Sequence, residues 1–363
     1  MKKKDYKRIV IKIGSNVLAL DDGLLNLQRI QKIVEQIVEL KNKGVEIIIV
    51  SSGAVASGRS YISLPDNYDA VSKRQVLASI GQIKLINAYR EYFEKYSFLC
   101  AQVLVSKEDF RDRNHYLNMQ NCISVLLQNN VIPIVNENDV ISITELMFTD
   151  NDELAGLIAS MVSAEALLLL TSVDGIFDGD PKNPQAKVIP IITPEMTNFS
   201  SFVNSGKSSF GRGGMITKCH IASRLTGIGI NVHIANGKKD NVILDVLKGI
   251  QTGTVFPAHK NTSSIKKWLA HSKDFSKGSV TVTDGAKAAL LSEKATSLLM
   301  IGVKNVEGYF HKGDIIKILD EENNFIGWGM SNFSSDKASQ LMGQKKQKPL
   351  IHYDYLFINK FFP

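Results

Sequence analysis

Short apolar runs alternate with amphipathic stretches over the first 250 residues of the chain. The apolar run at 8–13 is followed by apolar positions at helical spacing over 27–40, and residues 45–50 are again almost wholly apolar. Continuous apolar runs of this length predict buried strands, and apolar residues recurring every three to four positions predict a helix. These three segments therefore predict a β-α-β unit.

The same alternation continues to about residue 248. Further strands are expected at 97–105, 131–135, 166–171 and 230–235, and further helices at about 71–95, 114–129, 151–162, 215–226 and 240–248. Strands this apolar are buried on both faces, which is typical of a parallel sheet covered by helices. The predicted fold class is α/β, with a mainly parallel sheet sandwiched by helices.

The character of the sequence changes near residue 260. Residues 261–264 (NTSS) read as a linker, and beyond them short alternating runs are separated by Gly-Asp and Glu-Asn-Asn turns. A chain of 363 residues is long enough for two cores. We therefore predict two domains, a larger α/β domain at 1–260 and a small β-rich domain at 265–363.

Composition removes several classes of protein. The three cysteines, Cys100, Cys122 and Cys219, are far apart and form no CxxC pair, and no HxH or HExxH pair occurs among the histidines. Neither a disulfide framework nor a zinc site is expected, and we predict no metal site built by the protein. No run approaches the roughly 20 apolar residues of a membrane span, and no signal sequence opens the chain. We expect a cytoplasmic protein that does not enter membranes.

Small polar residues follow the predicted strands, at the sheet edge where open parallel sheets bind ligands. Gly14-Ser15-Asn16 follows the first strand, residues 51–58 (SSGAVASG) follow the second, and residues 136–139 (NEND) follow the fourth. Glycines and helix N-termini offer backbone N–H groups to anions. Lys12 lies inside an otherwise apolar strand, where its ammonium requires an anionic partner. The pattern indicates a site for phosphate or carboxylate groups.

Two further clusters carry candidate chemistry. In residues 149–154 (TDNDEL), Asp150 or Asn151 can cap a helix, but three acids and an amide in so few positions indicate a catalytic or substrate-binding role. Residues 211–218 (GRGGMITK) form a Gly-rich turn that enters a helix and resembles a phosphate cradle. The triplet Gly206-Lys207-Ser208 lacks the leading glycine of a P-loop, and neither GxGxxG after the first strand nor an HRD/DFG pair is present.

These motifs, taken in order, resemble the amino acid kinase family. The similar stretches are VIKIGSNVL, VSSGAVASG, IPIVNENDV, FTDNDELAG, LLLLTSVDGIFDGDP and GGMITK, and within the family they are most similar to members that phosphorylate glutamate. The C-terminal stretch DGAKAALLSEKATSLLMIGVKNVEGYFHKGDIIKI resembles a PUA domain. The resemblance implies the amino acid kinase fold followed by a PUA-like domain. It also implies transfer of phosphate from ATP to the side-chain carboxylate of L-glutamate, which gives L-glutamyl 5-phosphate, the first step of proline biosynthesis.

The family motifs assign roles to residues of this chain. By resemblance, Lys12 and Lys218 neutralise the transferring phosphoryl group, and Asp152 holds both lysines. For the substrate, Asp139 suits the α-ammonium of glutamate, whereas Ser52 and Asn151 can donate to its carboxylate oxygens. The remaining expected contacts are Gly53 to the substrate and, to ATP, Lys12, Gly14, Thr171, Ser172, Arg212, Gly213, Gly214, Met215, Ile216, Thr217 and Lys218.

The chain departs from the family pattern at two of these positions. Ser172 stands where the family commonly has Asp, and Arg212 stands where it commonly has Thr. Both positions belong to the ATP side. Mg²⁺ is expected to be held mainly by the ATP phosphates.

Other expectations follow from the resemblance and from charge. The family implies a homo-oligomer, a dimer or tetramer, and feedback inhibition by proline. Aspartate, carbamate, N-acetylglutamate and nucleoside monophosphates are the alternative acceptors within the family. The net charge is +7, and the segment from residue 261 carries no arginine. We interpret its lysine excess as an aid to solubility and leave RNA binding by the PUA-like domain as the alternative.

Overall fold

The described residues of this computed structural model fall into two compact units, Met1–Asn261 and Thr262–Pro363. The structure describes residues 5–20, 22–141, 148, 150–180, 183–193, 196, 214–258, 276–292 and 296–358. The predicted linker at 261–264 lies outside these residues.

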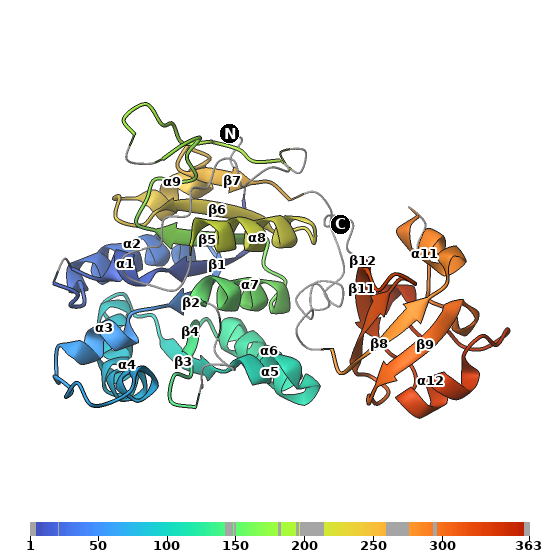
Figure 1. The fold of residues 1–363 in the computed structure, drawn as a ribbon. Coiled ribbons are helices and arrows are strands. Elements are labelled where there is room, and N and C mark those ends of the chain that lie inside the picture. The colour runs from blue at the N-terminus through green and yellow to red at the C-terminus, as the bar shows by residue number, and fades with distance from the viewer. Residues whose placement is uncertain are drawn as a thin grey trace. The chain divides into compact units, whose positions relative to one another are not determined.

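A seven-stranded sheet with the order β3-β4-β2-β1-β5-β6-β7 forms the centre of the first unit (Figure 1). Its strands are β1 (Arg8–Ile13), β2 (Glu46–Ser51), β3 (Cys100–Val105), β4 (Ile132–Glu137), β5 (Ala166–Thr171), β6 (Asn231–Asn236) and β7 (Thr254–Phe256). The first six are parallel, as predicted, and β7 adds an antiparallel edge strand that the sequence analysis missed.

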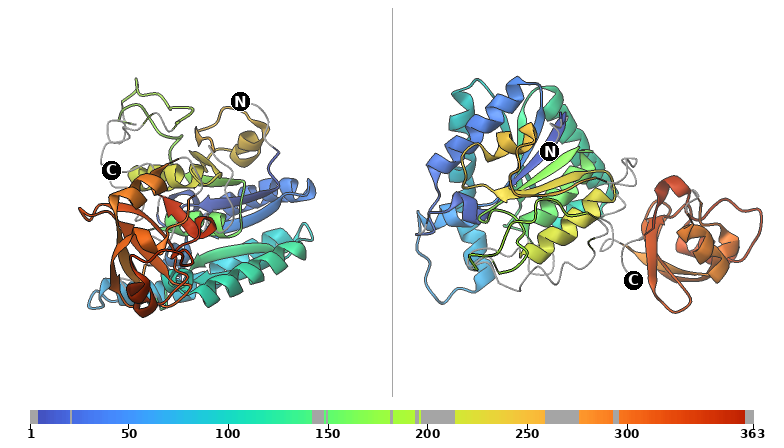
Figure 2. Two further views of the ribbon diagram at one scale, coloured as in Figure 1. Left: turned by 90° about the vertical axis from the view of Figure 1, so that its right-hand side faces the viewer. Right: turned by 90° about the horizontal axis from the view of Figure 1, so that it is seen from above.

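Helices cover both faces of this sheet, as the two views of Figure 2 show. They are α1 (Ser15–Leu18), α2 (Leu27–Asn42), α3 (Ala54–Arg59), α4 (Ala70–Glu94), α5 (Lys107–Arg111), α6 (Arg113–Gln128), α7 (Asn151–Met161), α8 (Met215–Thr226) and α9 (Val242–Lys248). The six longer predicted helices are present within about two residues at each end. The short helices α1, α3 and α5 were not predicted, because fewer than two turns leave no readable period.

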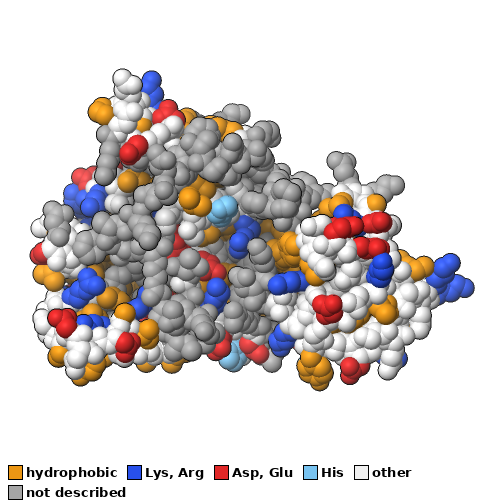
Figure 3. Space-filling model, in the orientation of Figure 1, with side chains coloured by type: hydrophobic (Ala, Val, Ile, Leu, Met, Phe, Trp, Pro, Cys, Tyr) orange, Lys and Arg blue, Asp and Glu red, His pale blue; other side chains and the backbone are white. Residues whose placement is uncertain are grey.

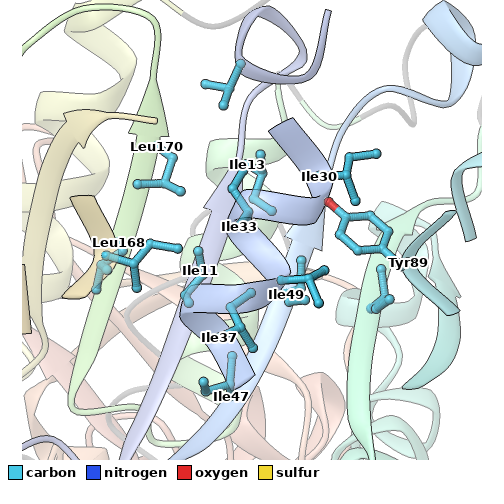
Figure 4. Close-up of a cluster of buried hydrophobic side chains, with 14 of the residues drawn as sticks. Ile11, Ile13, Ile30, Ile33, Ile37, Ile47, Ile49, Tyr89, Leu168 and Leu170 are labelled. Atoms are coloured by element: carbon cyan, nitrogen blue, oxygen red, sulfur yellow. The ribbon is translucent and has the colours of Figure 1, made fainter. Parts of the chain in front are cut away.

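Alternation along β1 assigns its side chains to two different faces. Ile9, Ile11 and Ile13 join a buried cluster with α2, α4 and the inner leucines of β5, shown in Figure 4. Lys12 has the opposite parity, so it points to the other face, where it meets α7 and α8. The alternation of one strand therefore separates the hydrophobic core from the charged site.

Helices α3 and α4 cross at a contact between backbones. A Cβ atom built on Gly81 would lie 1.9 Å from the carbonyl oxygen of Ala54, and one built on Gly58 would lie 2.0 Å from that of Leu77. Glycine is required at both positions, because any side chain would force the helices apart. This close crossing fixes α4 beside the carboxyl ends of β2 and β4.

The second unit is a five-stranded sheet with the order β12-β11-β10-β8-β9. Its elements are β8 (Gly278–Val282), α11 (Asp284–Leu291), β9 (Val303–Gly308), β10 (Ile315–Leu319), β11 (Phe325–Met330), α12 (Ser335–Leu341) and β12 (Leu356–Ile358). One sheet face packs on a core that includes Ile316, Ile318 and Phe310. The predicted fold class, an α/β sheet followed by a small β-rich unit, is confirmed.

Candidate active site

The candidate site lies at the carboxyl end of β1, the strand from which the sheet extends in both directions. Strand β1 pairs with β2 on one side and with β5 on the other, so their carboxyl ends meet in the middle of the sheet. The N–H of Gly14 donates to the carbonyl of Leu170 at 3.1 Å, and the N–H of Ser52 donates to that of Ile13 at 3.1 Å. These bonds hold the turns after β1 and β2 against their neighbours. In open α/β sheets such a switch point is the usual ligand site.

Two lysines share one buried aspartate at this point. Lys12 Nζ lies 2.6 Å from Asp152 Oδ1, and Lys218 Nζ lies 2.7 Å from Asp152 Oδ2. The aspartate side chain is fully buried, and each lysine side chain is only 8% exposed. These three buried groups together carry a net charge of +1, to which the neighbouring Asp150 adds one negative charge when it is ionised. The cluster is therefore suited to an anion that brings further negative charge.

The N-terminus of α7 supplies the acidic side of this cluster. Asp150 caps the helix by accepting hydrogen bonds from the N–H groups of Asp152 (2.8 Å) and Glu153 (3.0 Å). Burial, and then the neighbouring charge of Asp152, raise the pKa of Asp150. Burial also works to raise the pKa of Asp152, but the ammonium groups of Lys12 and Lys218 outweigh it and lower that pKa below its usual range. The two lysines thus favour the ionised form of Asp152.

A hydrogen-bonded group of polar side chains lies on the β2 and β4 side of the site. The amide nitrogen of Asn151 donates to Ser52 Oγ at 2.9 Å and to Asn136 Oδ1 at 3.0 Å. Asn136 in turn donates to Gln82 on α4 at 2.9 Å. Both amide hydrogens of Asn151 therefore already have protein acceptors.

Arg74 of α4 faces two buried carboxylates at the end of β4. Its Nε donates to Asp139 Oδ1 at 2.7 Å, and a terminal nitrogen donates to Glu137 Oε2 at 2.8 Å. Glu137 also accepts from the N–H of Phe148 at 2.9 Å, which ties the segment before α7 to this strand. Within this group of three described side chains, one guanidinium against two carboxylates leaves a net charge of −1, which suits a cationic group of a ligand.

The β5 and β6 side carries Thr171 and Ser172, two of the residues predicted for ATP. Thr171 ends β5 and accepts a hydrogen bond from the N–H of Gly237 at 2.8 Å, and Ser172 follows it. Gly214 is the N-cap of α8 and has no side chain with which to cap the helix that Met215 opens, so it leaves the first N–H groups of the helix without a cap from that position. Arg212 and Gly213 lie outside the described residues.

The structure brings most of the predicted residues to one edge of the sheet. Lys12, Asp152 and Lys218 are in direct contact, Ser52 and Asn151 are hydrogen-bonded to each other, and Gly53 adopts a left-handed conformation (φ 111°) between β2 and α3. Arg74, Gln82 and Asn136 were not predicted individually as site residues. Arg74 and Gln82 lie eight residues apart, on the stripe of α4 that contains buried Ala78. Polar residues on an otherwise buried stripe were the available signal.

Comparison with known families agrees with this geometry. The amino acid kinase family model matches residues 7–236, which include every candidate site residue, and the PUA domain model matches residues 278–353. The chain belongs to the amino acid kinase family. A second, PUA-type unit follows the kinase fold, as the resemblance implied.

Curated relatives match this amino acid kinase over nearly its whole length. It is 49% identical to the glutamate 5-kinase of Bacteroides thetaiotaomicron, covering 98% of this chain and 99% of that one. It is 50% identical to the glutamate 5-kinase of Chlorobaculum tepidum, covering 97% and 98%, respectively. The glutamate 5-kinase of Haemophilus influenzae is 38% identical, with coverage of 96% and 95%. Among the described helices, none combines the length and the hydropathy of a bilayer-spanning segment.

Proposed function

We propose that this amino acid kinase transfers the γ-phosphoryl group of ATP to the side-chain carboxylate of L-glutamate. A carboxylate oxygen forms a bond to the γ-phosphorus, the bond from that phosphorus to the β,γ-bridging oxygen breaks, and ADP leaves. The products are L-glutamyl 5-phosphate and ADP, the first step of proline biosynthesis. The observation that carries the proposal is the buried cluster of Lys12, Asp152 and Lys218. It lies between the half of the site proposed for glutamate and the half proposed for ATP.

The charge of the cluster suits this reaction. Phosphoryl transfer needs little covalent help, but two anions that repel each other must be held in line. The ammonium groups of Lys12 and Lys218 would face the oxygens on which charge gathers in the transition state. Asp152 would hold both lysines in place, so that little reorganisation is needed when the phosphoryl group moves.

The two halves of the site would receive the two substrates. Asp139 and Ser52, at the ends of β4 and β2, would hold glutamate, and the segment after β5 together with the N-terminus of α8 would hold ATP. Mg²⁺ commonly binds to substrate phosphates with few protein ligands. The buried Oδ2 of Asp150 has no hydrogen-bond partner among the described residues and fits a contact with the water shell of such an ion. Mg²⁺ would supply charge neutralisation of the phosphates.

The test is ATP turnover with glutamate as the only acceptor, with hydroxylamine present to trap the acyl phosphate as a hydroxamate. Aspartate, carbamate, N-acetylglutamate and UMP serve as competing acceptors in separate reactions. We expect hydroxamate and ADP in equal amounts with glutamate. Faster turnover of any other acceptor would overturn the assignment of the substrate.

We further propose that the chain assembles into a homodimer or tetramer, is inhibited by proline and acts in the cytoplasm. These proposals rest on the resemblance to the family. Light scattering of the purified protein measures its assembly, and proline titration under the same assay measures inhibition. Figure 3 shows Lys, Arg, Asp and Glu side chains interspersed on the visible face of the second unit, which favours solubility over RNA binding there.

A further inference from the structure

A chain of side-chain hydrogen bonds runs from helix α4 to the glutamate half of the site. Gln82 Oε1 accepts from Asn136 Nδ2 at 2.9 Å, and Asn136 Oδ1 accepts from Asn151 Nδ2 at 3.0 Å. The amide nitrogen of Asn151 also donates to Ser52 Oγ at 2.9 Å. Asn136, in the middle of this chain, accepts from Asn151 and donates to Gln82.

Backbone groups fix the direction of the chain. The N–H of Glu137, which can only donate, points to Asn136 Oδ1 at 2.9 Å. The carbonyl of Ser51, which can only accept, lies 3.4 Å from Asn151 Nδ2. If the amide of Asn136 turned over, its NH₂ group would face the N–H of Glu137. Two donors would then meet at a buried position, because Asn136 is only 3% exposed. The observed orientation is therefore the one in which every partner is matched.

The direction of these hydrogen bonds determines which donor and acceptor groups face a substrate. Because both hydrogens of the Asn151 amide are used, its Oδ1 is the part left for a ligand, and no described protein group donates to it. Ser52 Oγ accepts from Asn151, so its hydroxyl hydrogen remains for donation. An amide oxygen suits an ammonium group, and a hydroxyl hydrogen suits a carboxylate. Asn151 thus joins the net negative pair Glu137 and Asp139 in facing a cation.

We propose that Gln82 is a positioning residue whose amide oxygen, by accepting from Asn136, helps to hold the hydrogen-bond direction that the N–H of Glu137 selects in the glutamate half of the site. Its oxygen orients Asn136, which orients Asn151, so that an acceptor faces the α-ammonium of an amino acid substrate. This inference rests on the proposed glutamate kinase activity. It also changes the role expected for Asn151 from a donor to the carboxylate to an acceptor from the ammonium.

The chemistry of the side chain at position 82 allows a sharp test. Gln82→Glu keeps an acceptor oxygen, Gln82→Met removes it at nearly equal size, and Gln82→Lys offers donors alone. Gln31→Met, at an exposed glutamine on α2, is the matched control. Steady-state kinetics of the full-length chain, with glutamate and ATP varied separately, and thermal unfolding are measured for each variant.

We expect the KM for glutamate to rise about tenfold or more in Gln82→Met, with the KM for ATP unchanged within twofold. Gln82→Glu should stay within threefold of the parent, and Gln82→Lys should be at least as impaired as Gln82→Met. The lysine variant gives the same answer should the methionine variant fail to fold. Unchanged glutamate KM in both, or a Gln82→Glu variant as impaired as Gln82→Met, would overturn the inference. A parent chain without glutamate kinase activity would instead overturn the proposed function.

Discussion

Replacing Lys218 by Met removes one charge of the catalytic cluster while preserving most of the side-chain volume. In the parent chain two ammonium groups surround one carboxylate, and these three groups together carry a net charge of +1. In Lys218→Met the net charge is zero. Asp152 keeps its contact with Lys12 at 2.6 Å, so no buried charge is left alone and the variant should fold.

The magnitude follows from the distances and the burial. A unit charge about 4 Å from another is worth about 4 kcal/mol at an effective dielectric constant of about 20. Loss of one donor to transition-state charge typically costs about 2.7–4 kcal/mol, or a factor of about 10² to 10³ in kcat. We therefore expect kcat to fall by about 10² to 10³, while the KM for glutamate changes less than threefold.

The assay is hydroxamate formation under saturating glutamate and ATP, with circular dichroism to verify folding. Lys43→Met is the control, because Lys43 is exposed on the surface, pairs with nearby Glu39 and gives the same change in net charge. The control should keep its kcat within twofold. A folded Lys218→Met variant with kcat within threefold of the parent would remove Lys218 from the catalytic cluster.

Three further predictions concern stability and domain structure. Gly81→Ala should lower the free energy of unfolding by about 3 kcal/mol or more in urea titrations, because its Cβ would lie 1.9 Å from a backbone oxygen. Gly285→Ala, with open space around it, is the control and should be neutral or slightly stabilising. Burial raises the pKa of Asp150 to about 6, above its unfolded value near 4. Ionisation of Asp150 therefore destabilises the folded state above pH 6, and this free-energy penalty disappears as the pH falls to 4. Asp150→Asn, which can keep the helix cap, should therefore raise the free energy of unfolding by about 1–3 kcal/mol at pH 8 and should lose this advantage by pH 4. A difference in the free energy of unfolding between variant and parent that stays constant from pH 8 to pH 4 would refute the reasoning. A chain ending at residue 260 should remain soluble and phosphorylate glutamate, because the first unit contains every candidate site residue; a soluble, ATP-binding but inactive product, judged by kinetics and light scattering, would contradict this.

Strand and helix positions were largely readable from the sequence because their periods are local. The first and fifth strands have the predicted bounds, and the others differ by at most three residues at either end. The strand expected at 97–105 begins only at Cys100, since Ser97 takes a left-handed conformation (φ 59°) and the N–H of Phe98 bonds back to Phe93. The helix expected from residue 240 begins at Val242 because Asn241 is also left-handed (φ 58°). Positive φ values at non-glycine residues leave no reliable sequence signal.

The sequence alone determined the motifs of the site, because small polar residues after buried strands and a lysine within one of them are local features. Only the tertiary structure decided which of these residues meet. Lys12 and Lys218 are brought to the same carboxylate by the placement of β1 beside β5 and by the packing of α7 and α8. Arg74 and Gln82 look like ordinary polar residues of a long helix until the glycine contact between α3 and α4 sets them against β4. The local pattern of apolar residues determines whether each segment forms a helix or a strand. The contacts between segments depend instead on which surfaces can approach closely enough to pack and to pair every buried charge.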